Sequence, residues 1–229
     1  MRKSYNLFVF DIDGTLLDIF MRGHKPIFEA AGRIVHPDAI VIPGKNRGGT
    51  AFSTIQGALE GLVSEETIYL NEPKILLRVE ELLGEYLSDP KNLNLLPGVR
   101  QLLDEIYSCE NSKLGIVTGN VPNIANLLLS AHGIRHYFDF CSFAENRNDT
   151  RYEIFDRLIG YTTEQAGKPR RIFSFGDSES DISVGKELGA TTVGVTTGGH
   201  TIDELKSFGA DYAFNDLSDT RLVINTLFP

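Results

Sequence analysis

The chain has 229 residues, of which 41% are hydrophobic and 23% are charged, and this ordinary globular composition suits one substantial core or two unequal domains. The formal net charge of −9 argues against a nucleic-acid partner, because nucleic acid is bound by a clustered basic face. A small neutral or anionic substrate stays open, since the charge of a site is local.

The cysteines and the amino-terminal segment indicate the compartment. Cys109 and Cys141 are far apart and lack Cys-x-x-Cys spacing, so we expect buried thiols in a reducing compartment and no disulfide framework. The apolar run near the amino terminus is too short for a signal peptide or a membrane span. A cytoplasmic protein with no membrane partner is therefore the prediction.

The first predicted element is a short buried strand that runs into two acidic residues. Residues 7–18 read Leu-Phe-Val-Phe-Asp-Ile-Asp-Gly-Thr-Leu-Leu-Asp, which places Asp11 and Asp13 at the end of the apolar run. Neighbouring carboxylates raise each other's free energy and burial disfavours both, so the pair predicts a neutralising partner. A divalent cation such as Mg²⁺ with a phosphate would serve. An ordinary turn is the alternative interpretation of this motif alone.

Residues 19–92 show helical patterning with Pro and Gly punctuation, and they read as an inserted helical domain. One helix is predicted from Ile75, Val79, Leu82 and Tyr86. Pro73 is expected near its start, where a missing N–H does no harm.

The rest of the chain alternates strands and helices, as a parallel sheet requires. Apolar faces predict helices over residues 99–106 and 124–131, the second ending at Gly133. Further strands are predicted at 114–117, 172–175, 191–195 and 211–214, the last of them an edge strand.

Polar residues also follow the second and third predicted strands. Thr118, Gly119 and Asn120 follow one, and Asp177 follows the other with Asp181 four residues on. Ligands of open α/β sheets bind outside the carboxyl ends of the strands, so these ends should converge on one crevice. The Thr118 hydroxyl and the amides of Gly119 and Asn120, before a helix, would favour a phosphate.

Asp-x-Asp-Gly-Thr, a strand ending in Thr, and Gly-Asp-x-x-x-Asp occur here in the order and context of a known family. The chain thereby resembles the haloacid dehalogenase-like superfamily, in its phosphoglycolate-phosphatase-like capped subgroup. The resemblance covers most of the chain and implies an α/β fold: a Rossmann-like parallel sheet core at residues 1–17 and 93–229 and an inserted α-helical cap domain at 18–92. It implies a phosphoric monoester hydrolase for a small-molecule phosphate ester, and we expect a monomer or a homodimer.

The resemblance also assigns roles at the strand ends. It makes Asp11 the nucleophile that forms an aspartyl-phosphate, Asp13 the general acid, and Thr118 a donor to the phosphoryl group. It implies Mg²⁺ held by Asp11, the carbonyl of Asp13 and Asp177. Asp181 would bind the metal, orient its waters, or favour the start of a helix by its charge.

The family further requires a basic residue beside the phosphoryl group and the nucleophile. Arg151 is preferred, because it begins a helical stretch and its forked donors suit a phosphoryl group. Arg147 and Lys168 are the alternatives, and an exposed cation without a partner is the plain interpretation of each. Lys45 and Arg47 lie in a glycine-containing loop of a kind that faces the site in capped relatives. They are candidates for binding a carboxylate or second phosphate, or else part of a surface turn.

Rival functions stay open at this point. A phosphosugar mutase shares the core motifs, and a non-catalytic binding or regulatory member would keep the fold. Asp13 and Asp177 weigh against a dehalogenase of the same superfamily. A phosphonate-cleaving relative uses a lysine of its cap, and neither Lys25 nor Lys45 lies in a recognisable sequence context for that role. The five histidines show no ligand spacing and are expected to be structural or exposed.

Overall fold

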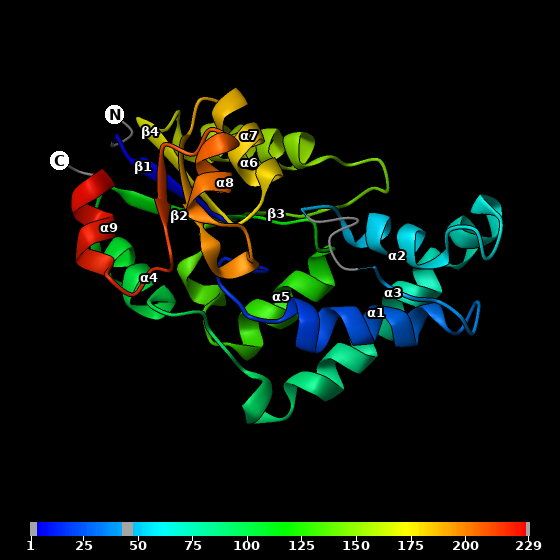
Figure 1. Ribbon diagram of the computed structural model, residues 1–229. Helices are drawn as coiled ribbons and strands as arrows, with labels where there is room; N and C mark the ends of the chain where they lie inside the picture. Colours follow the sequence, from blue (N-terminus) through cyan, green and yellow to red (C-terminus); the bar gives the residue numbers. More distant parts are fainter. Residues whose placement is uncertain (1–3, 43–47, 228–229) are drawn as a thin grey trace.

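The structure is a computed structural model that describes residues 4–42 and 48–227. Six strands form one parallel sheet in the order β3-β2-β1-β4-β5-β6 (Figure 1). The strands are β1 Asn6–Phe10, β2 Ser112–Val117, β3 Phe140–Ser142, β4 Arg171–Gly176, β5 Thr191–Val195 and β6 Tyr212–Phe214. With helices on both faces, this sheet confirms the predicted α/β class.

Strand β1 lies in the middle of the sheet and is buried on both faces. Leu7, Phe8, Val9 and Phe10 are all almost fully inaccessible to solvent. Alternate residues of a strand point to opposite faces, so Phe8 and Phe10 join one hydrophobic cluster while Leu7 and Val9 join another. Continuous apolar character is typical of a parallel strand covered by helices on both sides.

The helices divide between these two clusters. Side chains of α4, α5 and α9 pack in the cluster of Phe8 and Phe10, and those of α6 and α7 pack in the other. Figure 1 shows these two groups of helices on different sides of the sheet. The α-helices are α1 Lys25–Gly32, α2 Ala51–Leu59, α3 Glu65–Leu87, α4 Val99–Ser108, α5 Pro122–Ala131, α6 Arg151–Ala166, α7 Glu179–Glu187, α8 Ile202–Ser207 and α9 Thr220–Leu227. Single turns of other helix types are η1 Phe20–His24, η2 Pro90–Asn92, η3 Arg135–Tyr137 and η4 Thr196–Gly198.

The described part of the segment between β1 and α4 contains η1, α1, α2, α3 and η2 in sequence, joined by turns and coil, and no strand. Figure 1 shows α1, α2 and α3 beside the sheet rather than on its faces. Helix α3 packs against α5 of the core, and Asn123 donates to the Glu80 carboxylate at 3.0 Å. The insertion is therefore helical as predicted, and limits at residues 18 and 92 stay a prediction.

The expected position of Pro73 is wrong, because α3 begins eight residues earlier at Glu65 and Pro73 lies inside it. The helix start is fixed by Ser64, whose hydroxyl accepts from the Thr67 N–H at 3.2 Å. Pro73 cannot donate to the carbonyl of Tyr69. Both residues are exposed, so water can take the place of the missing donor.

Most other predicted elements are present at their expected places. The helix after Pro97 is α4, and α5 is followed by Gly133 in the left-handed region at φ +65°. The strand pattern at 211–214 corresponds to β6 at one edge of the sheet. The opposite edge strand, β3, was not predicted, since three residues show no usable periodicity.

Both cysteines are free, but Cys109 is exposed and Cys141 is only partly buried, so the expectation that both are buried is wrong. Cys109 lies just after α4, at the end of the sheet opposite the strand ends discussed below. Within residues 4–42 and 48–227, no helix has both the length and the apolar character needed to cross a bilayer.

Candidate active site

Three polar residues directly follow the carboxyl-terminal ends of neighbouring strands. Asp11 follows β1, Thr118 follows β2 and Asp177 follows β4, with β1 hydrogen-bonded between the other two. Phe10 is in register with Ile116 and Phe175, so the three strands end at nearly the same level. The strand order reverses here, and this is where open α/β sheets bind ligands.

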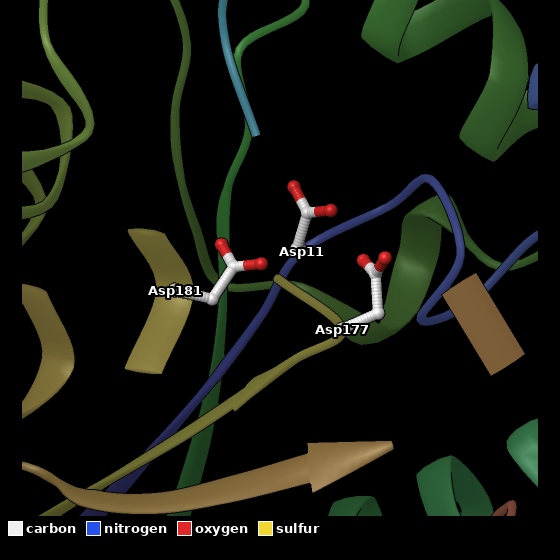
Figure 2. Close-up of side chains that lie close together, drawn as sticks. All are labelled: Asp11, Asp177 and Asp181. Atoms are coloured by element: carbon white, nitrogen blue, oxygen red, sulfur yellow. The ribbon is translucent and has the colours of Figure 1, made fainter. Parts of the chain in front are cut away.

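Three buried carboxylates meet at these strand ends. One oxygen from each of Asp11, Asp177 and Asp181 lies within 4.8 Å of the others (Figure 2). Asp181 comes from the first turn of α7, where its Oδ2 accepts from the Ser178 N–H at 3.1 Å and from the Ser178 hydroxyl at 2.6 Å. The side chain of Asp181 therefore caps α7 and also belongs to the acidic cluster.

Arg151 is the basic residue that the structure brings to this cluster. It is the first residue of α6, and its buried Nη1 donates to Asp11 Oδ1 and to the carbonyl of Val117, both at 3.0 Å. Its Nε lies 3.3 Å from Asp181 Oδ1. The two alternatives lie elsewhere: Arg147 pairs with Glu72 at 3.0 Å, and Lys168 is exposed.

The cluster carries more negative charge than Arg151 neutralises. Burial raises the pKa of Asp11 well above its usual range, the carboxylates of Asp181 and Asp177 raise it further, and Arg151 opposes them. Burial disfavours the charged form of Arg151, but Asp181 and Asp11 outweigh it and raise the pKa of the guanidinium. A further cation would relieve the remaining repulsion.

The donor set fits a hard divalent cation, which prefers carboxylate and carbonyl oxygens. Glycines keep the space beside Asp177 clear: a Cβ on Gly198 would lie 1.6 Å from Asp177 Oδ2, and one on Gly14 would lie 2.8 Å from it. Gly14 has φ +77°, and so permits the close approach expected of it. Thr15, a candidate for either a turn or a ligand contact, donates to Asp177 Oδ1 at 3.4 Å.

Asn120 connects Asp13 with Thr118. Its side-chain amide donates to Asp13 Oδ2 at 2.6 Å and to Thr118 Oγ1 at 3.2 Å, and its backbone N–H also reaches Thr118 Oγ1. Because the Thr118 oxygen accepts these bonds, its proton can be donated to another group. Asp13 and Thr118 thus lie on either side of Asn120, near Asp11.

His24 is the residue that sequence reasoning missed. It is buried on η1 of the insertion, and its Nδ1 lies 3.2 Å from Asp13 Oδ1. Its ring meets Phe28 edge to face at 5.9 Å between centroids. No spacing in the sequence indicates this contact, because it depends on how η1 packs against the strand ends.

The insertion also touches the site at Gly119. The Ala51 N–H donates to the Gly119 carbonyl at 2.8 Å, and a Cβ on Gly119 would lie 2.0 Å from the carbonyl oxygen of Gly49. The backbone of the insertion can approach this closely only because residue 119 is glycine. Lys45 and Arg47, predicted in the same segment, lie outside the described residues.

These parts enclose a cavity of about 450 Å³ between the strand ends and the insertion. The predicted residues Asp11, Asp13, Thr118, Gly119, Asn120, Arg151 and Asp177 all line it. Asp181 lies behind them, in contact with Arg151. A volume of this size suits a small-molecule ligand.

Comparison with known proteins bears on the chemistry of this site. A family model described as haloacid dehalogenase-like hydrolase matches residues 8–195. The phosphoglycolate phosphatase of Haemophilus influenzae is 24% identical over 229 residues, spanning 98% of this chain and 100% of the relative. Pyrimidine 5′-nucleotidase YjjG of Escherichia coli is 36% identical over 102 residues, or 42% of this chain and 43% of the relative. A β-phosphoglucomutase structure from Clostridium difficile superposes with a TM-score of 0.73 at 21% identity, covering 97% of this chain and 96% of that one, a likeness that shows the fold.

Proposed function

Because this chain belongs to the haloacid dehalogenase-like hydrolases, as its motifs predicted, we propose that it is a Mg²⁺-dependent phosphatase for small-molecule phosphate monoesters. The proposed reaction passes through an aspartyl-phosphate. The observation that carries it is the buried cluster of Asp11, Asp177 and Asp181, with Arg151 bonded to Asp11 at 3.0 Å in a cavity.

In this proposal Asp11, Asp177 and the backbone carbonyl of Asp13 hold Mg²⁺, and Asp181 holds Arg151 or reaches the ion. When bound, the ion neutralises charge on the phosphoryl oxygens and on Asp11. Burial and the neighbouring carboxylates raise the pKa of Asp11, and a bound cation would oppose that shift by favouring the carboxylate form.

The first step transfers the phosphoryl group to the protein. A carboxylate oxygen of Asp11 forms a bond to phosphorus while the bond from phosphorus to the alcohol oxygen breaks. Asp13 gives its proton to the departing oxygen. Arg151, the Thr118 hydroxyl and the amides of Gly119 and Asn120 hold the other phosphoryl oxygens.

The second step returns Asp11 to its starting state. Asp13, now a carboxylate, takes a proton from a water that attacks the phosphorus, and the bond from phosphorus to Asp11 breaks. Inorganic phosphate leaves, so each cycle consumes one ester and one water. The hydrogen bond from Asn120 and the nearby His24 ring hold Asp13 in place for both transfers.

The test is phosphate release from a panel of monoesters with Mg²⁺ and with a chelator. We expect release only with the metal, and a loss on the order of 10³-fold or more in Asp11→Asn, which removes the nucleophile. Asp156→Asn, at an exposed position of α6, is the matched control and should keep full activity. Near-normal activity in a folded Asp11→Asn protein would contradict the proposal.

The same panel separates a phosphosugar mutase from a phosphatase. With a sugar phosphate as substrate, a mutase forms an isomer and a phosphatase releases inorganic phosphate. We expect release without isomer formation, and no turnover of any ester with Mg²⁺ would favour a non-catalytic role.

A further inference from the structure

The insertion contributes an apolar patch to the cavity wall, beside polar lining residues that include His24 and Lys25. Phe20, Phe28, Val41 and Ile42 form this patch. Phe28 and Val41 are buried, but Phe20 and Ile42 are 37% and 53% exposed. Two large apolar side chains left in water at a cavity mouth are unfavourable until an apolar group covers them.

The lysine on this side is already neutralised. Lys25 Nζ donates to Glu29 Oε1 at 2.5 Å, and the same oxygen accepts from the Val41 N–H at 3.1 Å. Burial opposes ionisation of Glu29, but the bonds from Lys25 and Val41 lower its pKa below the usual value, so the carboxylate stays charged. Lys25 therefore offers an incoming anion little uncompensated charge.

The other charges along the described lining are no more favourable to an anion. Arg151 is the second Lys or Arg residue of that lining, and it is held by Asp11 and Asp181. Asp18 adds a half-exposed carboxylate, 3.9 Å from Arg22. A second negative charge on the substrate would meet Asp18 and no unpaired cation among the described residues.

From this arrangement we infer that the cavity selects phosphate monoesters of uncharged alcohols bearing an apolar group, and discriminates against alcohols bearing a carboxylate. The inference rests on the proposed phosphatase function and narrows its substrate class. Phe20 and Ile42 supply contact with the apolar group, and because Lys25 is paired with Glu29, a carboxylate finds no unpaired cation among the described lining residues.

The first experiment compares three alkyl esters: benzyl phosphate, ethyl phosphate and 2-phosphoglycolate. We expect kcat/KM for benzyl phosphate to exceed that for ethyl phosphate by about tenfold, from the apolar contact. Ethyl phosphate should exceed 2-phosphoglycolate by about tenfold, from the unpaired carboxylate.

Glu29→Gln tests the charge argument. The amide still accepts from the Val41 N–H but leaves Lys25 uncompensated, so the ratio of kcat/KM for 2-phosphoglycolate to that for ethyl phosphate should rise about tenfold. Glu81→Gln breaks the exposed Arg78–Glu81 ion pair, which does not line the cavity, and should leave the ratio unchanged. An unchanged ratio in folded Glu29→Gln would overturn the charge argument.

Phe20→Ala tests the apolar contact. It should lower the preference for benzyl over ethyl phosphate about tenfold, whereas Leu77→Ala, at an exposed position of α3 outside the cavity lining, should not. Equal preferences in both variants would contradict the assigned contact.

The outcomes separate this inference from the proposed function. If none of the esters releases phosphate with Mg²⁺, the function and the inference both fail. If all are hydrolysed and 2-phosphoglycolate is the best substrate, the function stands and the inference falls. Lys45→Ala and Arg47→Ala would then test the earlier hypothesis that those cations bind a carboxylate.

Discussion

Arg151 contacts the acidic cluster, whereas the two alternative basic residues, Arg147 and Lys168, lie elsewhere. Its guanidinium bonds Asp11 and the Val117 carbonyl and faces Asp181, so it orients the nucleophile and would reach a phosphoryl oxygen. We predict that Arg151→Met lowers kcat/KM by roughly 10²- to 10³-fold, the usual effect of removing one donor to a developing anion. Phosphate release at saturating Mg²⁺ measures it.

The controls for Arg151 are the two cations that the structure places elsewhere. Arg147→Met and Lys168→Met, assayed well below their unfolding temperatures, should change kcat/KM by less than about threefold. Equal losses in all three variants would leave Arg151 without a special role.

His24 provides a second prediction at the residue scale. Its Nδ1 is 3.2 Å from Asp13 Oδ1, so it helps to hold the carboxyl group that transfers protons. We predict that His24→Ala lowers kcat about tenfold with a smaller change in KM, and that His24→Asn recovers part of the loss. His36→Ala, on a partly exposed histidine of the same insertion, should keep normal kinetics. A change in KM alone would indicate a substrate contact instead.

The sequence allowed the acidic residues to be predicted, but not His24. Asp11 and Asp177 directly follow apolar strands, and the rule for parallel sheets brings such ends together. His24 reaches Asp13 only through the irregular turn of η1, and nothing in its local sequence differs from that of an ordinary structural histidine.

At the scale of elements, the ion pair of Arg147 with Glu72 joins the insertion to the core. Arg147, in the loop before α6, lies 3.0 Å from the buried Glu72 of α3, and its guanidinium lies 5.1 Å from the ring centroid of Tyr69. Arg147→Met would leave a buried carboxylate without its partner, and we predict a loss of about 2 kcal/mol in the free energy of unfolding. In the double variant Glu72→Gln/Arg147→Met no buried carboxylate remains, so most of that loss should disappear. Urea unfolding measures the free energy of unfolding of each variant.

The pH dependence of this variant has a definite sign. Burial raises the pKa of Glu72, and Arg147 opposes that shift. Because the pKa of Glu72 is higher in the folded than in the unfolded protein, ionising this carboxyl costs folding free energy, and the cost appears as pH rises from the unfolded pKa through the folded pKa. Removal of Arg147 raises the folded pKa of Glu72 further. The loss in the free energy of unfolding of Arg147→Met should therefore be smaller at about pH 5 than at about pH 7.5. If the loss in the free energy of unfolding were independent of pH, it would come from the lost packing of Arg147 on Tyr69 rather than from the charge of Glu72.

Element boundaries could be predicted where side chains cap helices, and less well elsewhere. Thr150 with Glu153 and Thr201 with Glu204 have the spacing of capping boxes, and both mark helix starts in the structure. Pro73 was misleading, because proline favours a helix start in general, yet the exposed face of a long helix tolerates it. The short strand β3 depends on its neighbour β2 for its pairing rather than on its own sequence.

At the scale of the whole molecule, the acidic cluster links metal binding to folding. In the absence of a cation, burial and the neighbouring carboxylates raise the pKa of Asp11, so the metal-free protein carries an energetic cost that grows as pH rises. A divalent cation that binds only the folded state stabilises it in proportion to the logarithm of its concentration. The chain's net charge of −9 adds a weaker, non-specific attraction for Mg²⁺ over the entire surface.

We therefore predict that Mg²⁺ raises Tm, and raises it more near pH 7.5 than near pH 5, because protons compete with the metal for the cluster. Asp177→Asn should lose most of this increase, whereas Asp156→Asn, an equal change of charge at an exposed position, should keep it. Differential scanning fluorimetry over a range of Mg²⁺ concentrations at constant ionic strength measures both variants. Equal Tm increases in the two variants would mean that Mg²⁺ acts on the surface charge alone. The proposal of a metal site at the strand ends would then be wrong.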